Sequence, residues 1–463
     1  MKETNTDTSR RRFLRNAGIL ALGATLGGCV AGSGNDESSS AAGTGAMTLR
    51  TNPNTGDKVS LLGFGCMRFP TLGMANGSDD DTLDQEAINR LVDMALEGGV
   101  NYFDTSPAYC KGQSEAAIGN ALARHPRDSY FIATKLSNFS PAQWSHEAGV
   151  EMFQNSLKNL HTDYIDYLLL HAIGMGGMDA LHGRYLDNGM LDYLVEQRKN
   201  GTIHNLGFSY HGDIEVFDYL LAMMDRGEIH WDFVQIQLNY LDWLHAKEIN
   251  ESNTDASYLY GELHRRGIPV VIMEPLLGGR LASVPEPVLD KMDDLRPGDN
   301  PARWAFRYAG TPEGVLTVLS GMAYTDHLRE NLATFSPLQP CDEAEDAFLM
   351  RCAREILLND TVPCTDCKYC MPCPYGVNIP GVFAHYNKCV NEGNAPRDNE
   401  DPRYAAERRA FLFGYDRTVP RLRQADRCVS CGTCVSHCPQ GINIPAQLHR
   451  IDRYAESLRQ GKV

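Results

Sequence analysis

Eight cysteines near the C-terminus form two runs whose spacing suits iron–sulfur chemistry. The first run is Cys364, Cys367, Cys370 and Cys373, and the second is Cys428, Cys431, Cys434 and Cys438. Thiolates separated by two residues can converge on one [4Fe-4S] cubane, and a cysteine before proline binds the other cluster of a pair. The second run fits C-x2-C-x2-C-x3-C-P, whereas the first has one residue fewer before Cys373. The two runs therefore predict two [4Fe-4S] clusters.

Zinc is the main alternative for these cysteines, because paired C-x2-C motifs also bind zinc. Four cysteines per run, each closed by Cys-Pro, exceed what a zinc ribbon needs. A disulfide framework suits a small secreted domain rather than the end of a 463-residue chain. We therefore favour clusters, and we expect the cysteines without cluster spacing to be packing residues: Cys66, Cys110, Cys341, Cys352 and Cys389.

Short apolar runs alternate with amphipathic stretches between residues 47 and 336. The eight candidate strands are residues 61–64, 101–104, 130–134, 165–170, 205–209, 233–237, 270–273 and 315–319. Residues 84–97, 147–160 and 213–225 show helical periodicity. Strand followed by helix, eight times, predicts an α/β fold, a (β/α)8 TIM barrel. A doubly wound sheet is the competitor, but no G-x-G-x-x-G follows the first candidate strand.

Polar side chains follow several of these candidate strands. Chemistry in such a barrel takes place at the C-terminal strand ends. Each residue alone has a structural explanation, since Asp104 could be a helix cap and His171 a core histidine. Their joint placement indicates a site, and the residues in chain order are Asp104, Tyr109, Lys135, His171, Ser209, Tyr210, His211, Gln235 and Asn239.

The motifs around these residues are similar to those of the aldo-keto reductases. They are D-T-S-P-A-Y at residues 104–109, G-Q-S-E at 112–115, T-K-L at 134–136, D-Y-I-D at 163–166 and L-L-L-H at 168–171. The resemblance covers about residues 48–335. Together with the C-terminal cysteines and an N-terminal twin-arginine signal, the chain resembles the iron–sulfur branch of that family, with a 4Fe-4S ferredoxin-type domain.

This resemblance implies a catalytic tetrad of Asp104, Tyr109, Lys135 and His171. A phenol is a poor acid at neutral pH, and the ammonium of Lys135, held by Asp104, is expected to lower the pKa of Tyr109. Tyr109 then protonates a carbonyl oxygen as hydride arrives from a nicotinamide, while His171 hydrogen-bonds the same oxygen. In the oxidative direction Tyr109 acts as the base.

The resemblance also implies positions for a nicotinamide dinucleotide. Ser209 and Gln235 would hold the carboxamide, and the remaining contacts with pyrophosphate, adenine and phosphate would come from Leu276, Gly278, Ser320, Gly321, Glu330 and Asn331. Two positions depart from the family pattern, because Tyr210 replaces an asparagine and Met273 replaces the tyrosine that stacks on the nicotinamide. Arg329 is the one basic candidate for a 2′-phosphate, so the choice between NADP and NAD stays open.

The C-terminal third resembles the alpha-helical ferredoxins. Residues 341–359 have the pattern of a linking helix, and residues 404–413 add a helix between the two cysteine runs. By this analogy three cysteines of each run share a cluster with the last cysteine of the other run. One set is Cys364, Cys367, Cys370 and Cys438, and the other is Cys428, Cys431, Cys434 and Cys373.

The N-terminus resembles a twin-arginine export signal. Residues 9–15, S-R-R-R-F-L-R, precede a weakly apolar stretch over residues 17–30. Cys29 follows L-G-G as in a lipobox and would become a lipid anchor; ordinary cleavage is the alternative. Residues 33–45 have the composition of a flexible tether. We expect a protein exported already folded with its clusters, periplasmic or anchored on the outer face of the membrane, with a cytoplasmic location as the alternative.

Composition limits the function further. A net charge of -16 and a pI near 5.3 argue against nucleic acid as a partner. We predict three parts, with a signal and tether over 1–46, a reductase-like barrel over 47–336 and a ferredoxin-like domain over 337–463. The expected function is a carbonyl or alcohol oxidoreductase whose clusters relay electrons to or from a redox partner protein. The alternative is an electron-transfer protein whose catalytically silent barrel serves for docking.

The substrate is expected to be a small carbonyl or alcohol compound. In the resembling family, specificity resides in variable loops, here residues 173–189 and 241–256. Candidates to line the pocket are His182, Tyr185, Trp243 and His245.

Overall fold

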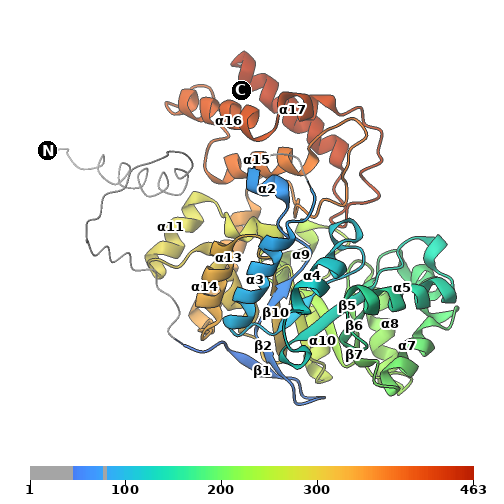
Figure 1. Cartoon of the computed structure of the whole chain (residues 1–463). Helices are drawn as coiled ribbons and strands as arrows, with labels where there is room; N and C mark the ends of the chain where they lie inside the picture. Colours follow the sequence, from blue (N-terminus) through green and yellow to red (C-terminus); the bar gives the residue numbers. More distant parts are fainter. Residues whose placement is uncertain (1–44, 77–80) are drawn as a thin grey trace, which may run out of the picture. The chain divides into compact units, whose positions relative to one another are not determined.

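A closed barrel of eight parallel strands forms the centre of the described structure (Figure 1). The computed structural model describes residues 45–76 and 81–463, so the twin-arginine motif and Cys29 lie outside the described residues. The strands are hydrogen-bonded in the order β10-β3-β4-β5-β6-β7-β8-β9. Their bounds are β3 (Leu62–Gly65), β4 (Tyr102–Asp104), β5 (Phe131–Leu136), β6 (Ile165–Ile173), β7 (Ile203–Tyr210), β8 (Phe233–Gln237), β9 (Val270–Met273) and β10 (Val315–Ser320). The predicted TIM barrel is confirmed.

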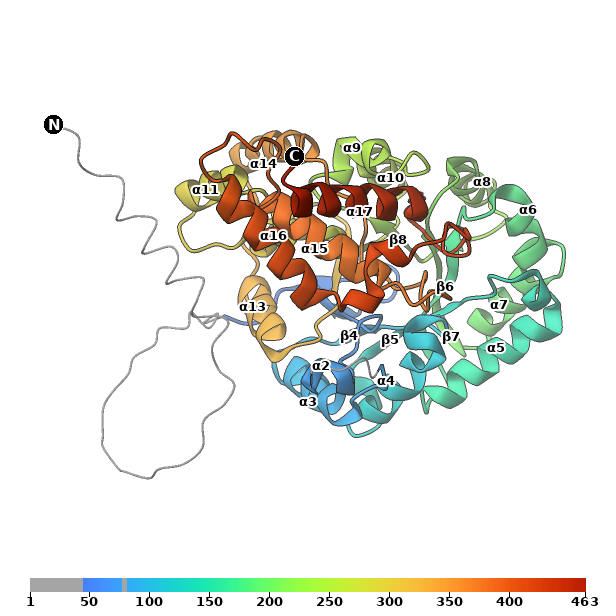
Figure 2. The same ribbon diagram turned by 90° about the horizontal axis from the view of Figure 1, so that it is seen from above.

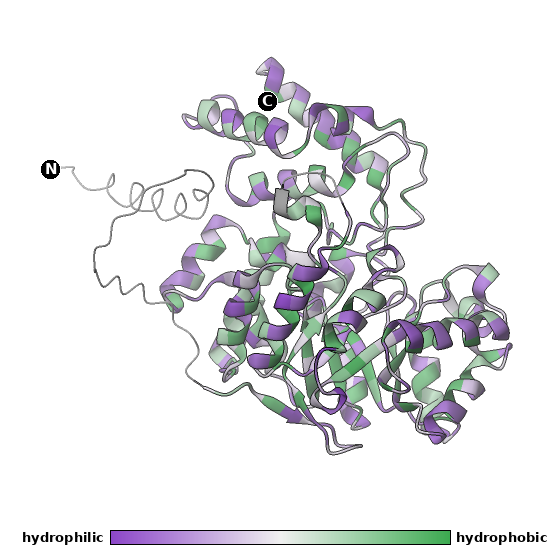
Figure 3. Ribbon diagram, viewed as in Figure 1, coloured by the Kyte–Doolittle hydropathy of each residue, from purple (hydrophilic) through white to green (hydrophobic). Residues whose placement is uncertain are grey.

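Both faces of these strands are buried, which explains their nearly continuous apolar sequence. Aromatic rings fill the barrel interior, with the ring centroid of Tyr167 5.0 Å from that of Tyr102 and 5.1 Å from that of Phe233. A second and larger core lies between the strands and the surrounding helices. Figure 3 shows the strands as mainly hydrophobic ribbons, whereas the surrounding helices carry hydrophilic residues as well.

The helices of the barrel begin where the sequence supplies caps. The Asp84 carboxylate accepts from the Ala87 amide at 2.9 Å to start α3, and Ser145 caps α5 in the same way. The three predicted helical stretches are therefore each found within about one residue. The bounds are α2 (Leu72–Asn76), α3 (Gln85–Glu97), α4 (Ser114–Leu122), α5 (His146–Asn159), α6 (Gly177–Leu181), α7 (Met190–Lys199), α8 (Ile214–Asp225), α9 (Asp242–Ile249), α10 (Ala256–Arg265), α11 (Glu286–Leu295), α12 (Pro301–Gly310) and α13 (Thr325–Phe335).

An antiparallel hairpin, which the sequence analysis missed, precedes the barrel. It pairs β1 (Leu49–Thr51) with β2 (Lys58–Ser60), and these three-residue strands are too short to show a clear period. Asn52, which follows β1, donates to the Tyr167 hydroxyl at 3.0 Å and to the Asn205 side chain at 3.2 Å. Both partners lie near the starts of their strands, so the hairpin contacts the N-terminal end of the barrel.

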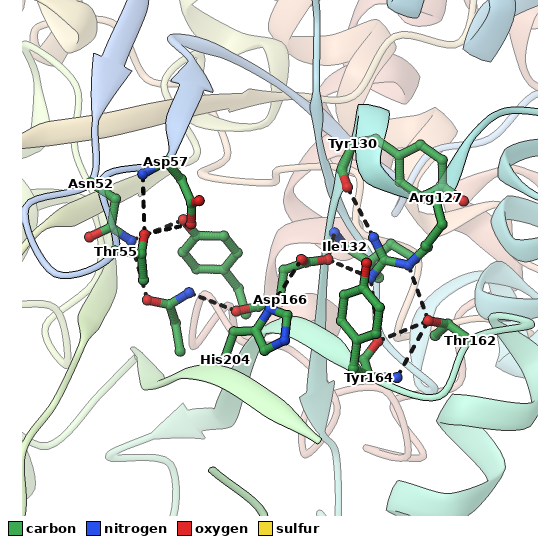
Figure 4. Close-up of polar contacts among 12 residues, drawn as sticks. Asn52, Thr55, Asp57, Arg127, Tyr130, Ile132, Thr162, Tyr164, Asp166 and His204 are labelled. Atoms are coloured by element: carbon green, nitrogen blue, oxygen red, sulfur yellow. Dashed lines mark hydrogen bonds and ion pairs between the residues drawn. The ribbon is translucent and has the colours of Figure 1, made fainter. Parts of the chain in front are cut away.

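A polar network surrounds Asp166 at the same end (Figure 4). The carboxylate of this residue accepts from the Arg127 guanidinium at 2.6 Å and from the Ile132 amide at 2.8 Å. The guanidinium also lies 4.0 Å from the ring centroid of Tyr164. Asp166 is the second residue of β6, whereas the chemistry of a barrel belongs to the opposite strand ends. The D-Y-I-D motif therefore has a structural role.

Four further helices follow the barrel: α14 (Glu343–Leu357), α15 (Ile379–Asn391), α16 (Tyr404–Thr418) and α17 (Ile444–Gln460). Helix α14 shares the core of the barrel helices, while the other three surround a separate core that begins at Val362. The hydrophobic cores thus divide between Ile356 and Val362, later in the chain than the predicted boundary at residue 337. All described residues belong to one unit of the chain.

The similar tetrapeptides that follow the two cysteine runs begin equivalent helices. In V-N-I-P and I-N-I-P the asparagines, Asn378 and Asn443, cap α15 and α17 by accepting backbone N–H bonds at 3.2 Å. The prolines, Pro380 and Pro445, occupy the first turn, where their missing N–H costs no hydrogen bond. Figures 1 and 2 show α15, α16 and α17 grouped together. Among the described helices, none has the length and apolar composition required to span a membrane.

We expect Asp166→Ala to lower the free energy of unfolding by about 2–4 kcal/mol, because it leaves the buried Ile132 amide without its acceptor and removes the charged partner of the Arg127 guanidinium. Urea denaturation measures the change. Asp163→Ala, at an exposed position three residues earlier, is the control and should change stability by less than about 0.5 kcal/mol. Equal effects of the two substitutions would contradict the structural role of Asp166.

Candidate active site

The four predicted tetrad residues come together at the C-terminal ends of three adjacent strands. Asp104 ends β4, Lys135 lies in β5 and His171 lies in β6, while Tyr109 opens a short turn after β4. The Lys135 Nζ atom lies 4.8 Å from the Tyr109 ring centroid, and the ring centroids of Tyr109 and His171 are 5.8 Å apart. The structure thus gathers all four side chains in one place.

A buried ion pair holds the centre of this group. Lys135 donates to Asp104 Oδ1 at 2.5 Å and to the Thr105 carbonyl at 2.8 Å, and its side chain has no exposed surface. Gln235 donates to the second oxygen, Asp104 Oδ2, at 3.2 Å. Burial raises the pKa of Asp104, while the charge of Lys135 and these hydrogen bonds oppose the rise. Both charges depend on each other, because a buried ion without its partner is strongly unfavourable.

Tyr109 differs from the expectation based on the sequence. Burial raises the pKa of its phenol well above the ordinary value, and the charges of Asp104 and Glu274 raise it further. Lys135 is engaged with Asp104 and Thr105 rather than with the phenol, so the predicted lowering of the pKa is wrong for this arrangement. Tyr109 therefore holds its proton at neutral pH and can act as a proton donor.

A chain of hydroxyl groups orients His171. The Ala108 amide donates to Ser106 Oγ at 3.0 Å, Ser106 Oγ is 2.8 Å from Ser137 Oγ, and Ser137 Oγ is 2.6 Å from His171 Nδ1. The amide can only donate, so Ser106 Oγ accepts there, and each serine hydroxyl has a proton that it can donate toward His171 Nδ1. Burial lowers the pKa of His171, as do the nearby charges of Lys135 and Arg184. The imidazole is therefore neutral at neutral pH, and a proton on Nε2 is compatible with this chain.

The side chains expected to bind a nicotinamide have partners within the protein. Ser209 Oγ accepts from the Ala172 amide at 2.8 Å, and Gln235 is the residue that supports Asp104. The hydroxyl of Tyr210, one of the departures from the family pattern, hydrogen-bonds to the Gly212 carbonyl. Ser209 still has a hydroxyl proton to donate, whereas the amide nitrogen of Gln235 is already engaged.

The positions expected near the phosphates and adenine also make internal contacts. Asn331 donates to Ser320 Oγ at 3.0 Å, and Glu330 accepts from Asn300 at 3.0 Å. Gly321 faces the side chain of Arg68, which a Cβ at Gly321 would meet at 3.3 Å. None of these three contacts fills the space of a ligand by itself.

The turn that contains Leu276 and Gly278 is covered by the C-terminal domain. A Cβ at Gly278 would come within 3.0 Å of three atoms of Thr365. Thr365 itself is 1% exposed. On the side of Gly278 where a Cβ would point, Thr365 therefore leaves no space for a dinucleotide.

The four proposed substrate-lining residues have other partners. Tyr185 is fully buried and donates to the Leu136 carbonyl at 2.9 Å, and the Trp243 ring packs against Tyr308. The two histidines each face a nearby carboxylate on the same surface segment, His182 with Asp187 at 2.9 Å and His245 with Glu248 at 3.0 Å. The Tyr185 hydroxyl also accepts from the His171 amide at 3.2 Å, whereas no contact of the other three with a tetrad residue is found among the described residues.

Two residues near Tyr109 were missed by the sequence analysis. Glu274 directly follows β9 with φ of 54°, its Oε2 atom is buried without a hydrogen bond among the described residues, and burial raises its pKa to about 7. Tyr369 lies between two cluster cysteines, yet its hydroxyl is within electrostatic range of Tyr109 and Lys135. A carboxylate after a strand was a signal for Glu274, whereas nothing in the sequence linked Tyr369 to the barrel.

The cysteines predicted to bind clusters form two groups that cross between the runs. Cys364, Cys367, Cys370 and Cys438 line one cavity whose other walls are mainly apolar, with Ile379, Phe383, Ile442 and Ile444 among them. Cys434 interacts electrostatically with Cys428, Cys431 and Cys373. Four thiols around an apolar space suit a [4Fe-4S] cluster in the first group, and in the second group Cys434 is within electrostatic range of the other three thiols. The other described cysteines lie outside both groups, with Cys66, Cys341, Cys352 and Cys389 buried and Cys110 half-buried.

Comparison with protein families matches both halves of the structure. Residues 61–345 match the model of the aldo/keto reductase family, and residues 363–442 match that of the 4Fe-4S dicluster domain. The second match favours iron–sulfur clusters over zinc for the C-terminal cysteines.

Individual relatives resemble the barrel. L-galactose dehydrogenase of Arabidopsis thaliana is 27% identical over 311 residues, which are 63% of this chain and 89% of that protein. D-arabinose 1-dehydrogenase of Saccharomyces cerevisiae is 34% identical over 164 residues, 33% of this chain and 46% of that protein. Among solved structures, the holo form of aldo-keto reductase AKR11C1 from Bacillus halodurans has a TM-score of 0.51 and 24% identity, covering 66% of this chain and 96% of that one.

The crossed grouping of cysteines predicts which substitutions share an effect. Cys438→Ser and Cys364→Ser should remove the same cluster signal in electron paramagnetic resonance spectra of the dithionite-reduced protein. Cys373→Ser and Cys428→Ser should remove the other signal, and each variant should lose about half of the iron. Cys389→Ala, a buried cysteine of the same domain, is the control and should retain both signals. Loss of the same signal in Cys438→Ser and Cys428→Ser would contradict this grouping.

Proposed function

The chain belongs to the aldo/keto reductase family, and we propose that it interconverts a carbonyl and an alcohol, with Tyr109 as acid and base. The observation that supports this most directly is the convergence of Tyr109, the Lys135–Asp104 pair and His171 at one end of the barrel. This group can donate a proton and orient an oxygen, which are the tasks that reduction of a carbonyl requires.

Each residue has a separate task in the proposed reaction. Tyr109 donates its proton to the carbonyl oxygen, and its raised pKa keeps that proton in place before the reaction. The Nε2 proton of neutral His171 hydrogen-bonds the same oxygen and fixes its position. Lys135 provides a buried positive charge beside the Tyr109 ring, which stabilises the phenolate left after proton transfer.

Reduction of a carbonyl to an alcohol consumes two electrons and two protons. One proton reaches the oxygen from Tyr109, and the carbon gains the remaining hydrogen. A bound [4Fe-4S] cluster supplies one-electron transfer, so the two predicted clusters match the number of electrons. We propose that the cluster domain exchanges these electrons with a redox partner protein, while the substrate is a small carbonyl or alcohol compound.

A nicotinamide dinucleotide is the electron donor that the family resemblance implied, and it stays a prediction. The engaged amide of Gln235 and the covered turn at Gly278 argue against it. For this reason we give no residue a role in hydride transfer from NADP or NAD.

We also propose that the protein is exported by the twin-arginine pathway. The motif at residues 9–15 supports export of a folded protein, and the L-G-G-C sequence that ends at Cys29 supports a lipid anchor. Cell fractionation with wild type and Arg11→Lys, Arg12→Lys tests the first point. Accumulation of both proteins in the same fraction would contradict it.

We expect Tyr109→Phe to reduce carbonyl turnover about 100- to 10,000-fold, because it removes the general acid. The assay uses cluster-loaded full-length protein and a panel of small aldehydes and ketones, with reduced methyl viologen or NADPH as electron donor. Tyr102→Phe is the control. It also removes a buried hydroxyl from β4, but this hydroxyl has no hydrogen-bond partner among the described residues, so turnover should not change.

Equal turnover by the Tyr109→Phe and Tyr102→Phe variants would exclude Tyr109 as the acid. Absence of turnover in the wild-type protein with every carbonyl and both donors, with clusters still reducible, would favour the alternative of an electron-transfer protein with a silent barrel.

The pH dependence of reduction follows from the two shifted groups. A lowered pKa means that His171 becomes charged only in acid, and a raised pKa means that Tyr109 loses its proton only in alkali. The turnover number for reduction should therefore be constant between about pH 6 and 8, where an ordinary histidine would titrate. The reverse oxidation should rise with pH, since it needs the phenolate. A break in reduction near pH 6.5 that disappears in His171→Gln would show that His171 titrates normally.

A further inference from the structure

Arg68 joins the barrel to the first cysteine run. This residue follows β3, and its guanidinium donates to the carbonyls of Thr365 and Asp366, the latter at 3.1 Å. The same guanidinium lies 3.6 Å from the Asp366 carboxylate. Arg68 also covers Gly321 after β10. One arginine therefore links two strand ends of the barrel to the segment between the first two cluster cysteines.

Gly278, in the turn after β9, receives the same segment. Its φ is 66°, and the position of a Cβ is filled by the backbone and side chain of Thr365. Gly279 is its immediate neighbour with φ of 100°, but a Cβ there would meet no atom within 4 Å. The close approach of Thr365 is thus specific to Gly278.

Further contacts extend this docking around the rim. Arg280 donates to Thr361 Oγ1 at 3.0 Å. Ser283, at the end of the same turn, accepts from Asn391 of α15, and Asn250 after α9 donates to the Pro439 carbonyl at 3.2 Å. Both cysteine runs therefore have neighbours that contact loops at the C-terminal ends of the strands.

We propose that residues 361–370, here called the cap segment, form a wall of the Tyr109 site and occupy the place of a dinucleotide on the barrel. Thr365 fills the turn at Gly278, and Arg68 fastens the segment to the barrel. The substrate pocket is therefore built jointly by the barrel and the cluster domain, and it admits a small carbonyl compound while excluding NADP and NAD.

The source of electrons is constrained by this arrangement. The two electrons for a carbonyl have to come from a one-electron donor protein of low potential, because the hydride donor has no binding surface. The second proton comes from solvent. The inference rests on the proposed function in one respect, because Tyr109 marks the site. Its test measures hydrogen exchange and dinucleotide binding rather than turnover, so the two proposals can fail separately.

The test is hydrogen exchange of the cluster-loaded full-length protein, followed by mass spectrometry of peptides that cover residues 361–370. Gly278→Ala should accelerate exchange in these peptides about tenfold or more, because the new methyl group displaces Thr365. Gly279→Ala adds the same methyl group at a second left-handed glycine and should leave the cap segment as protected as in the wild type. Arg68→Ala should also release the cap segment and accelerate its exchange. Arg90→Ala, on the exposed face of α3, is the control for this variant.

Titration of the same wild-type protein with NADPH and NADH, followed by nicotinamide fluorescence, completes the test. No saturable binding is expected up to about 1 mM, which corresponds to a binding free energy weaker than about -4 kcal/mol. Unchanged exchange in both Gly278→Ala and Arg68→Ala would overturn the docking of the cap segment. Saturable binding of either dinucleotide to wild type, with the cap segment still protected, would overturn the exclusion even if Tyr109→Phe abolishes turnover.

Discussion

The candidate site depends on one buried ion pair, Lys135 with Asp104. Lys135 donates to one oxygen of Asp104, and Gln235 satisfies the second carboxylate oxygen. The pair joins two adjacent strands, so the positive charge beside the Tyr109 ring is fixed by the barrel and not by a mobile loop. Preorganisation of this kind lets a charge stabilise a developing anion without rearrangement during the reaction.

The properties of Tyr109 and His171 follow from the same burial. Removal of water raises the pKa of the phenol and lowers that of the imidazole, so both groups are neutral at neutral pH. Two neutral groups that can donate a proton then lie beside one fixed ammonium. This combination suits an oxygen atom that becomes negatively charged.

The cluster domain is attached at the C-terminal ends of the barrel strands. Arg68, Gly278 and Arg280 lie at or after those ends, and all contact residues 361–366. The first cysteine run, which has one residue fewer before its last cysteine than the second run, is the run that contains Thr365 and Asp366.

The sequence by itself predicted the eight strands that the structure confirms, the four tetrad residues that the barrel brings together and the cysteines that form two groups. Each of these depends on local pattern: apolar runs that alternate with helical stretches, polar residues directly after them, and thiols at fixed spacing. The sequence did not reveal the hairpin before the barrel, whose strands are too short to show a period, or the direction of the pKa shift at Tyr109, which depends on burial. Only the tertiary structure placed Thr365 on Gly278 and the Arg68 guanidinium on the Thr365 and Asp366 carbonyls, because contacts between segments far apart in the chain are fixed by packing and not by spacing.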